Sequence, residues 1–412
     1  MRRIYTGIDI GSYAIKMVVC EYVSGKFHVL ASTNVRSKGI QSGLIVDMDE
    51  AAISLGKAKK NLEEMLGVNL NQAIVSVPSD GINFDIVSGK ININPDELIA
   101  SNQIMDVFKE AMIGHIADDR EVITILPISF QVDNKEECKD PKGQMGECLS
   151  VKAVITTIPK YFLSQTTELL RKVDIEAVDV GFNSLGDYYE VRNKEIDSEV
   201  VGIINIGFDT TEVSIFNKGI MIKDEKIDAG SKLIEIDLAR KYNLKRGVAR
   251  YVKESFAVSN TRYADSNDVL ELTDKNNEKI TIQQLEVSET VESRLVEILK
   301  LAKKQINILT NREISYIIIT GGISEMAGFQ YVVENIFDRR TSTFNIGTMG
   351  VRSNVYSSVL GLIKYFHYKL EFRGNSYSMF DEKMTENLNS TKGKMAGSSN
   401  DSIISKVFGY FS

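Results

Sequence analysis

Two glycine-containing turns in this sequence could hold the phosphate groups of a nucleotide. The first follows an apolar stretch and contains Asp9, Gly11 and Ser12, with Lys16 five residues after Gly11. Backbone N–H groups in a glycine turn can approach phosphate oxygens, and Asp9 could hold a water molecule bound to Mg²⁺. Lys16 could reach a phosphate as a point charge. A plain β-hairpin would carry the same residues, so this turn alone does not identify a phosphate site.

The second turn contains Asn205, Gly207, Thr210 and Thr211, and it offers N–H and hydroxyl donors in a similar arrangement. Taken alone it is equally ambiguous. Two such turns at the start of two similar halves are much harder to explain by chance. Together they favour a nucleotide clamped between two lobes.

A third element follows the apolar run Tyr316–Thr320, where Gly321 and Gly322 are adjacent. Adjacent glycines let the backbone approach a ligand closely, so this strand end could contact a flat ring or a ribose. An ordinary strand-to-helix turn explains the element equally well on its own.

The elements that would position these turns form an internal repeat. Each half is expected to run strand, strand, strand, helix, strand, which predicts a duplicated α/β fold rather than a solenoid. The first copy should contain strands starting at 4 and over 15–20, 27–31 and 73–77, and a helix over 49–66. The second should contain strands starting at 200 and over 212–217, 219–227 and 316–320, and helices over 231–242 and 284–309.

Two segments interrupt the repeat. Residues 83–163 carry a helix pattern at 96–113 and strand patterns at 121–132 and 150–158, which predicts a small inserted α+β subdomain. Residues 245–282 form a second insertion with polar turns.

The composition disfavours several classes of protein. The 412 residues include 49 Lys and Arg and 56 Asp and Glu, and the resulting net charge of −7 argues against a general nucleic-acid binder. Three cysteines form no disulfide framework, three dispersed histidines form no zinc motif, and no serine stands in a G-x-S-x-G elbow. No secretory signal is recognisable, and no apolar run approaches the ~20 residues of a membrane span. A cytoplasmic protein is therefore expected.

The C-terminal segment is expected to bind a membrane surface. Residues 371–400 are polar and predict a flexible linker, whereas 401–412 become apolar again. Helical spacing brings five apolar side chains to one face: Ile403, Ile404, Val407, Phe408 and Phe411. A helix of about eleven residues is marginal alone, and a membrane interface would stabilise it by burying this face. Docking of the helix on its own protein is the alternative.

These motifs resemble the ATPase core of the actin, Hsp70 and sugar-kinase superfamily, and within it the FtsA family of bacterial cell-division proteins. The stretch Glu121–Asp133, with Pro127, is similar to that family's Pro-x-x-(aromatic)-x-(Val/Leu)-Asp strand. The stretch Asp140–Leu149 is similar to its Asp-Pro-x-Gly-Met-x-Gly-x-x-Leu loop, with Met145 displaced by one place.

The resemblance implies an actin-like duplicated fold with an FtsA-type insertion. ATP and Mg²⁺ would lie in the central cleft, the protein would polymerise head to tail, and it would bind the C-terminal tail of the tubulin-like protein FtsZ. It would lie on the inner face of the cell membrane at the division site. The implied divisions are 1–83 with 164–198, the insertion 84–163, 199–230 with 300–370, the smaller subdomain 231–299, the linker 371–400 and the helix 401–412.

The resemblance also assigns roles to single residues. Asp9, Gly11, Ser12 and Lys16 fall on the first phosphate turn, with Asp9 toward the metal, and Gly207, Thr210 and Thr211 fall on the second. Gly230 and Lys253 resemble nucleoside contacts, and Gly321 and Gly322 match the adenosine motif. The water-positioning residues are expected to be Glu176 and Asp179, just before a hinge at 182–186.

The chain departs from the family pattern at three positions: Asn205 replaces an aspartate, Arg250 replaces a glutamate, and Ile323 replaces a third glycine. The first matters most, because an amide carries no charge and takes up no proton. We therefore expect ATP binding with slow or absent hydrolysis. Asp209 could compensate for Asn205.

Two other readings remain open. An ATP-hydrolysing enzyme of the Hsp70 or sugar-kinase type would need a further substrate-binding domain or a catalytic base. A pilus-assembly type of actin homologue shares the inserted subdomain but lacks the membrane helix, so the C-terminal segment discriminates.

Overall fold

The structure is a computed structural model that describes residues 2–337, 341–343 and 346–388. It contains two five-stranded sheets with matching strand orders. The first has the order β3 (Lys26–Arg36), β2 (Ala14–Val23), β1 (Arg3–Ile10), β6 (Gln72–Ser76) and β10 (Glu176–Gly181). The second has the order β13 (Ile220–Ile227), β12 (Thr211–Asn217), β11 (Val200–Ile206), β16 (Tyr316–Thr320) and β17 (Thr341–Thr343). The predicted duplication is confirmed.

Helices cover both sheets and create two apolar cores. On the first lobe, α1 (Met48–Leu66) begins at Asp47, whose side chain accepts from two N–H groups of the first turn, and ends at Gly67 with a φ of 69°. α3 (Lys160–Arg171) also packs on this lobe, through Leu169 and Leu170. The second lobe carries α5 (Lys232–Lys241), α6 (Arg246–Ser255), α7 (Gln284–Leu309) and α8 (Phe329–Glu334).

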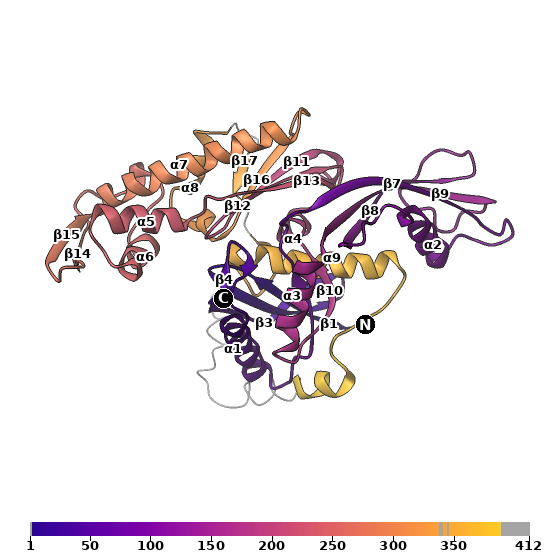
Figure 1. Cartoon of the computed structure of the whole chain (residues 1–412), viewed down its shortest axis with the longest axis horizontal. Coiled ribbons are helices and arrows are strands. Elements are labelled where there is room, and N and C mark those ends of the chain that lie inside the picture. Colours follow the sequence, from indigo (N-terminus) through magenta and orange to yellow (C-terminus); the bar gives the residue numbers. More distant parts are fainter. Residues whose placement is uncertain (1, 338–340, 344–345, 389–412) are drawn as a thin grey trace.

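Two small hairpins complete the lobes. β4 (Ile40–Gln41) pairs with β5 (Leu44–Ile45) on the first lobe, and β14 (Val269–Thr273) pairs with β15 (Lys279–Gln283) at the far end of the second. Figure 1 shows the second lobe extending to one side of the first and the inserted subdomain extending to the other.

The inserted subdomain is a three-stranded sheet covered by one helix. β9 (Cys148–Pro159) lies between β7 (Asn83–Asn92) and β8 (Arg120–Val132), and α2 (Ser101–Met112) packs on them. The helix starts five residues later than predicted. The reason is that Ile99 exchanges backbone hydrogen bonds with Gly143 and Gln144, which holds the preceding residues in an extended loop.

Two helices cross where the lobes join. They are α4 (Asn183–Val191) and α9 (Ser357–Phe372), and the crossing is close because Gly186 and Gly361 face each other. A Cβ atom on Gly361 would lie only 1.6 Å from the backbone oxygen of Gly186. The predicted hinge at 182–186 is therefore the first turn of α4.

The prediction of a flexible linker from residue 371 is wrong for its first part. Residues Met379, Phe380 and Leu388 are buried in the core of the first lobe, and the Met379 N–H donates to the Ile4 carbonyl. The segment has few apolar residues, so its composition did not indicate this docking, but three buried side chains are enough to anchor it. The predicted helix 401–412, with Ile403, Ile404, Val407, Phe408 and Phe411, lies outside the described residues. Among the residues that are described, no helix is both long enough and apolar enough to cross a membrane.

Candidate nucleotide-binding site

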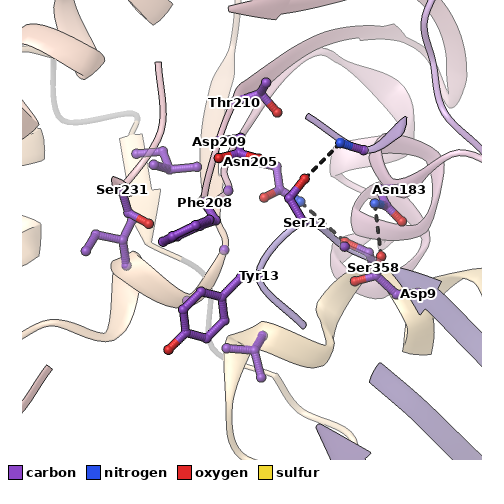
Figure 2. A pocket seen from close by; sticks show the side chains of 18 of the residues that line it. Asp9, Ser12, Tyr13, Asn183, Asn205, Phe208, Asp209, Thr210, Ser231 and Ser358 are labelled. Atoms are coloured by element: carbon purple, nitrogen blue, oxygen red, sulfur yellow. Dashed lines mark hydrogen bonds between the residues drawn. The ribbon is translucent and has the colours of Figure 1, made fainter. Parts of the chain in front are cut away.

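A cavity of about 600 Å³ lies where the two lobes meet. Both glycine turns and the strand end at Gly321 and Gly322 contribute to its lining, and so do Lys16, Asn205 and Lys253. Figure 2 shows side chains of both lobes facing one another across it. The structure therefore brings together the three elements that the sequence analysis singled out.

The first turn places a buried carboxylate beside a lysine. Asp9 and Lys16 are partners in the β1–β2 ladder, and the Lys16 Nζ atom lies 2.6 Å from Asp9 Oδ2. Asn183 donates to Asp9 Oδ1 over 3.2 Å, and Ser76 donates to the same oxygen over 3.4 Å. The Ser12 hydroxyl accepts from the Gly43 N–H at 2.8 Å. Asp9 is thus held by donors from three elements and is only 2% exposed.

Asn183 is a site residue that the sequence analysis missed. It is the first residue of α4, two positions after the last residue of β10. It lines the cavity, and its amide oxygen is buried without a hydrogen-bond partner among the described residues. A water molecule on a metal ion near Asp9 would satisfy this oxygen. The available signal was a polar residue in the short turn between a strand and a helix.

The second turn is closed by its own backbone. The Gly207 N–H donates to the Thr210 carbonyl, and both residues line the cavity. Asp209 accepts from Lys232 at 2.7 Å and from the Ser42 N–H at 2.9 Å. Burial alone would raise the pKa of Asp209, but these two donors bring it below its usual value. Asp209 therefore holds the two lobes together at the turn, which differs from the expectation that it could replace a carboxylate at position 205.

Two residues of the second lobe that were predicted to contact the nucleotide, Thr211 and Gly230, instead pack against neighbouring backbone of the second turn. Thr211 is fully buried, and its hydroxyl donates to the Ala229 carbonyl at 2.6 Å. A Cβ atom on Gly230 would lie 2.3 Å from the Phe208 oxygen. Neither Thr211 nor Gly230 is among the described residues that line the cavity. The prediction that Thr211 and Gly230 contact the nucleotide directly therefore does not agree with the structure. Ser231, the residue after Gly230, lines the cavity instead.

One end of the cavity combines aromatic rings and cations. Tyr13 and Phe208, at the tips of the two turns, have ring centroids 4.9 Å apart. Lys253 lies at this end and donates to Glu235 at 2.8 Å. Arg250, at the second departure from the family pattern, donates to the same carboxylate at 3.2 Å. The two basic residues share one fully buried acid, so Arg250 supports Lys253.

The structure has no room for a side chain at Gly321 or Gly322, the two glycines after β16. Gly321 has a φ of 94°, and a Cβ atom there would lie 2.4 Å from the Ile206 oxygen. On Gly322 it would lie 2.8 Å from the Val355 side chain. Both glycines line the cavity, as predicted.

The prediction that Glu176 and Asp179 position water does not agree with the structure. Glu176 pairs with Gln72 at the amino ends of two parallel strands, whereas the cavity lies at their carboxyl ends. Asp179 forms an ion pair with Lys369 of α9. Neither acid is among the described residues that line the cavity.

Asn205 lies at the cavity, as predicted, but with a partner that the sequence did not indicate. Its amide nitrogen donates to Asp187 Oδ2 at 2.5 Å and to the Ser358 hydroxyl at 3.3 Å. Burial raises the pKa of Asp187 to about 6, although hydroxyl and amide donors around it oppose the shift.

A second acid, the half-buried Glu212, lies at the edge of the cavity. Glu212 is the cross-strand partner of Asn205, in the place that Lys16 takes opposite Asp9. Ser79 donates to Glu212 at 3.0 Å. Burial, together with the nearby Asp224 carboxyl, raises the pKa of Glu212 from 4.5 to about 8.

Glu212→Gln is expected to stabilise the nucleotide-free protein at alkaline pH. Between pH 4.5 and 8 the unfolded chain releases the Glu212 proton while the folded chain retains it, so rising pH favours unfolding. The variant removes this effect, so its free energy of unfolding should exceed that of the original protein by at least about 1 kcal/mol at pH 8.5, with an upper bound of about 5 kcal/mol for the whole shift, and differ little at pH 4.5. Denaturant unfolding at both pH values measures it. The exposed Glu225→Gln on β13 should show no such pH dependence, and equal behaviour of the two variants would contradict the assignment.

The cavity has the donors and acceptors that a magnesium-bound nucleotide needs. Lys16 and the turn N–H groups suit phosphates, and Asp9 with the unsatisfied Asn183 oxygen suits metal-bound water. In the described part of the chain no three His, Cys, Asp or Glu side chains form a metal cluster.

Solved structures define the class of this fold as actin-like. The PilM–PilN type IV pilus biogenesis complex matches with a TM-score of 0.57 and 14% identity, over 87% of this chain and 97% of that chain. MreB5 of Spiroplasma citri bound to ADP matches with a TM-score of 0.55 and 13% identity, over 90% of this chain and 97% of that chain. At these identities the similarity shows the fold alone.

Sequence comparisons identify the family. The model described as "SHS2 domain inserted in FTSA" matches residues 80–157, and the model "Cell division protein FtsA" matches residues 202–361. The FtsA of Bacillus subtilis (strain 168) is 25% identical over 93% of this chain and 88% of its own length. The FtsA of Streptococcus pneumoniae serotype 2 is 23% identical over 88% of this chain and 79% of its own length. The chain belongs to the FtsA family and is a cell-division homologue of actin.

Proposed function

We propose that this protein binds ATP with Mg²⁺ in the cavity between its lobes and hydrolyses it slowly or not at all. The observation that carries this proposal is the convergence of both glycine turns and the Gly321 strand end on one cavity. Lys16 and the turn N–H groups would hold the phosphates, and Asp9 would hold the water shell of the ion. The similar MreB5 structures of Spiroplasma citri contain ADP and AMPPNP, which supports a nucleotide rather than another anion.

Slow hydrolysis follows from the chemistry of Asn205. The metal ion supplies charge neutralisation at the phosphates when it is bound. The Asn205 amide can accept a hydrogen bond from water but cannot take a proton from it. Phosphoryl transfer depends on orienting the attacking water and on stabilising charge, so the amide should leave little turnover.

We further propose that the protein polymerises and links FtsZ filaments to the inner face of the cell membrane at the division site. Membership of the FtsA family supports the partner FtsZ and self-association. The apolar spacing of residues 403–411 supports an interfacial helix. A pilus-assembly role has only the fold likeness to the PilM–PilN complex in its favour.

Removal of residues 402–412 is expected to abolish sedimentation of the protein with liposomes. Weak single anchors become firm when a polymer multiplies them, so the full chain with ATP should carry FtsZ into the liposome pellet. Co-sedimentation with FtsZ and anionic liposomes, with and without ATP, measures both steps. Unchanged sedimentation of the shortened chain would refute the anchor, and FtsZ left in the supernatant would refute the link.

A further inference from the structure

We propose that Asp187 is a positioning residue that turns the amide oxygen of Asn205 toward the nucleotide cavity. The proposal rests on the proposed binding of magnesium-bound ATP. It gives a function to a buried acid that belongs to neither glycine turn.

The surroundings of Asp187 fix which end of the Asn205 amide faces it. Asp187 is fully buried, and its two oxygens accept from four side chains: Asn205 at 2.5 Å, Ser357 at 2.6 Å, Ser358 at 2.9 Å and Thr320 at 3.1 Å. An ionised carboxylate only accepts hydrogen bonds. The Asn205 group that faces it must therefore be the NH₂ group.

The opposite end of the amide is directed to the cavity. Asn205 Oδ1 lies 3.1 Å from the position that a Cβ atom would take on Gly321, a glycine that lines the cavity. In Figure 2 the Asn205 nitrogen points to Ser358, and its oxygen points away from Ser358. Position 205 therefore presents an uncharged acceptor, which can hold a water molecule on the metal ion.

The donors around Asp187 come from both sides of the helix crossing. Asn205 and Thr320 end strands of the second lobe, and Ser357 and Ser358 begin α9. The charge of Asp187 also raises the pKa of two nearby acids, Glu212 and Glu190, of which Glu190 is paired with Lys364. The orientation of Asn205 is thus tied to the junction of the lobes.

Asp187→Asn tests the proposal with little change in shape. An amide at position 187 offers a donor and an acceptor, and the surrounding hydroxyls can rotate to match either, so Asn205 is free to flip. We expect the gain in ATP affinity on adding Mg²⁺ to fall about fivefold, which corresponds to one hydrogen bond of ~1 kcal/mol. Affinity for ATP without Mg²⁺ should stay within twofold. The double variant N205D/D187N reverses the donor and acceptor and should restore or exceed the original gain.

Asp197→Asn is the matched control. Asp197 accepts from Tyr188 and Arg192 at the other end of α4, so it tests the helix without touching Asn205. This variant should keep the Mg²⁺ gain. The proposal would be overturned if Mg²⁺ increased the ATP affinity of D187N as much as that of the original protein. It would also be overturned if D197N lost as much of this increase as D187N.

A spectroscopic measurement on the nucleotide-free chain separates this proposal from the proposed function. With asparagine-selective ¹⁵N labelling, the Asn205 side-chain NH₂ signal is assigned by its loss in Asn205→Ser. We expect that signal to move in D187N and to stay in D197N. If it moves although the original protein binds no ATP, the proposed function fails and the orientation of Asn205 stands. If it does not move, the orientation by Asp187 is wrong.

Discussion

Gly361→Ala is expected to lower the free energy of unfolding by about 3 kcal/mol, which is the largest effect we anticipate for a single methyl group in this chain. The added Cβ atom would lie 1.6 Å from the Gly186 oxygen and 2.9 Å from the Glu190 nitrogen. Both neighbours are backbone atoms of α4, so no side chain can move aside. The two helices must separate, and Ser357 and Ser358 would then shift from Asp187.

Gly247→Ala provides a matched control. Gly247 also lies in a helix, α6, but a Cβ atom there meets nothing within 4 Å. This substitution should raise the free energy of unfolding by about 0.5–1 kcal/mol, because alanine loses less backbone entropy than glycine. Denaturant titrations of the two variants measure the difference. Equal stability of the variants would contradict the close crossing of α4 and α9.

Lys16→Met is expected to weaken ATP binding about 100-fold, or ~2.7 kcal/mol. The substitution removes a cation from the phosphate turn. It also leaves Asp9, which is 2.6 Å from Lys16 Nζ, with a negative charge that repels the nucleotide. Titration calorimetry with ATP and Mg²⁺ measures the effect, and circular dichroism checks that the variant is folded.

Lys60→Met is the control for loss of a lysine. Lys60 lies on α1, its side chain is 75% exposed, and it faces Glu64 at 3.8 Å. It should leave ATP affinity unchanged. Full ATP affinity in the folded Lys16 variant would show that this turn does not hold the phosphates.

The local pattern of the sequence was enough to predict the framework. The helix α7 begins and ends at Gln284 and Leu309 as predicted, because an apolar stripe of helical period marks its whole length. β16 is found at Tyr316–Thr320 because a short apolar run ends in two glycines. The turns at Asp9 and Gly207 were predictable because a glycine at a strand end is a local signal.

Contacts between distant segments could not be predicted in this way. Asp187 lies 2.5 Å from Asn205 only because α4 passes the carboxyl end of β11, and no spacing in the sequence records this. The sequence predicts Glu176 near the site because this residue comes shortly before the expected hinge at 182–186. The direction of β10 puts it at the opposite end of the sheet. Met379 is buried only because the assembled core of the first lobe offers a place for it, and the local sequence around Met379 carries no signal of that core.

The most direct test of the central claim is a crystal structure of this chain with a non-hydrolysable ATP analogue and Mg²⁺. We predict the triphosphate between residues 9–12 and 207–210, with Lys16 on a phosphate and the base near Gly321. A nucleotide bound elsewhere, or none at millimolar concentration, would contradict the claim that the two lobes hold ATP between them.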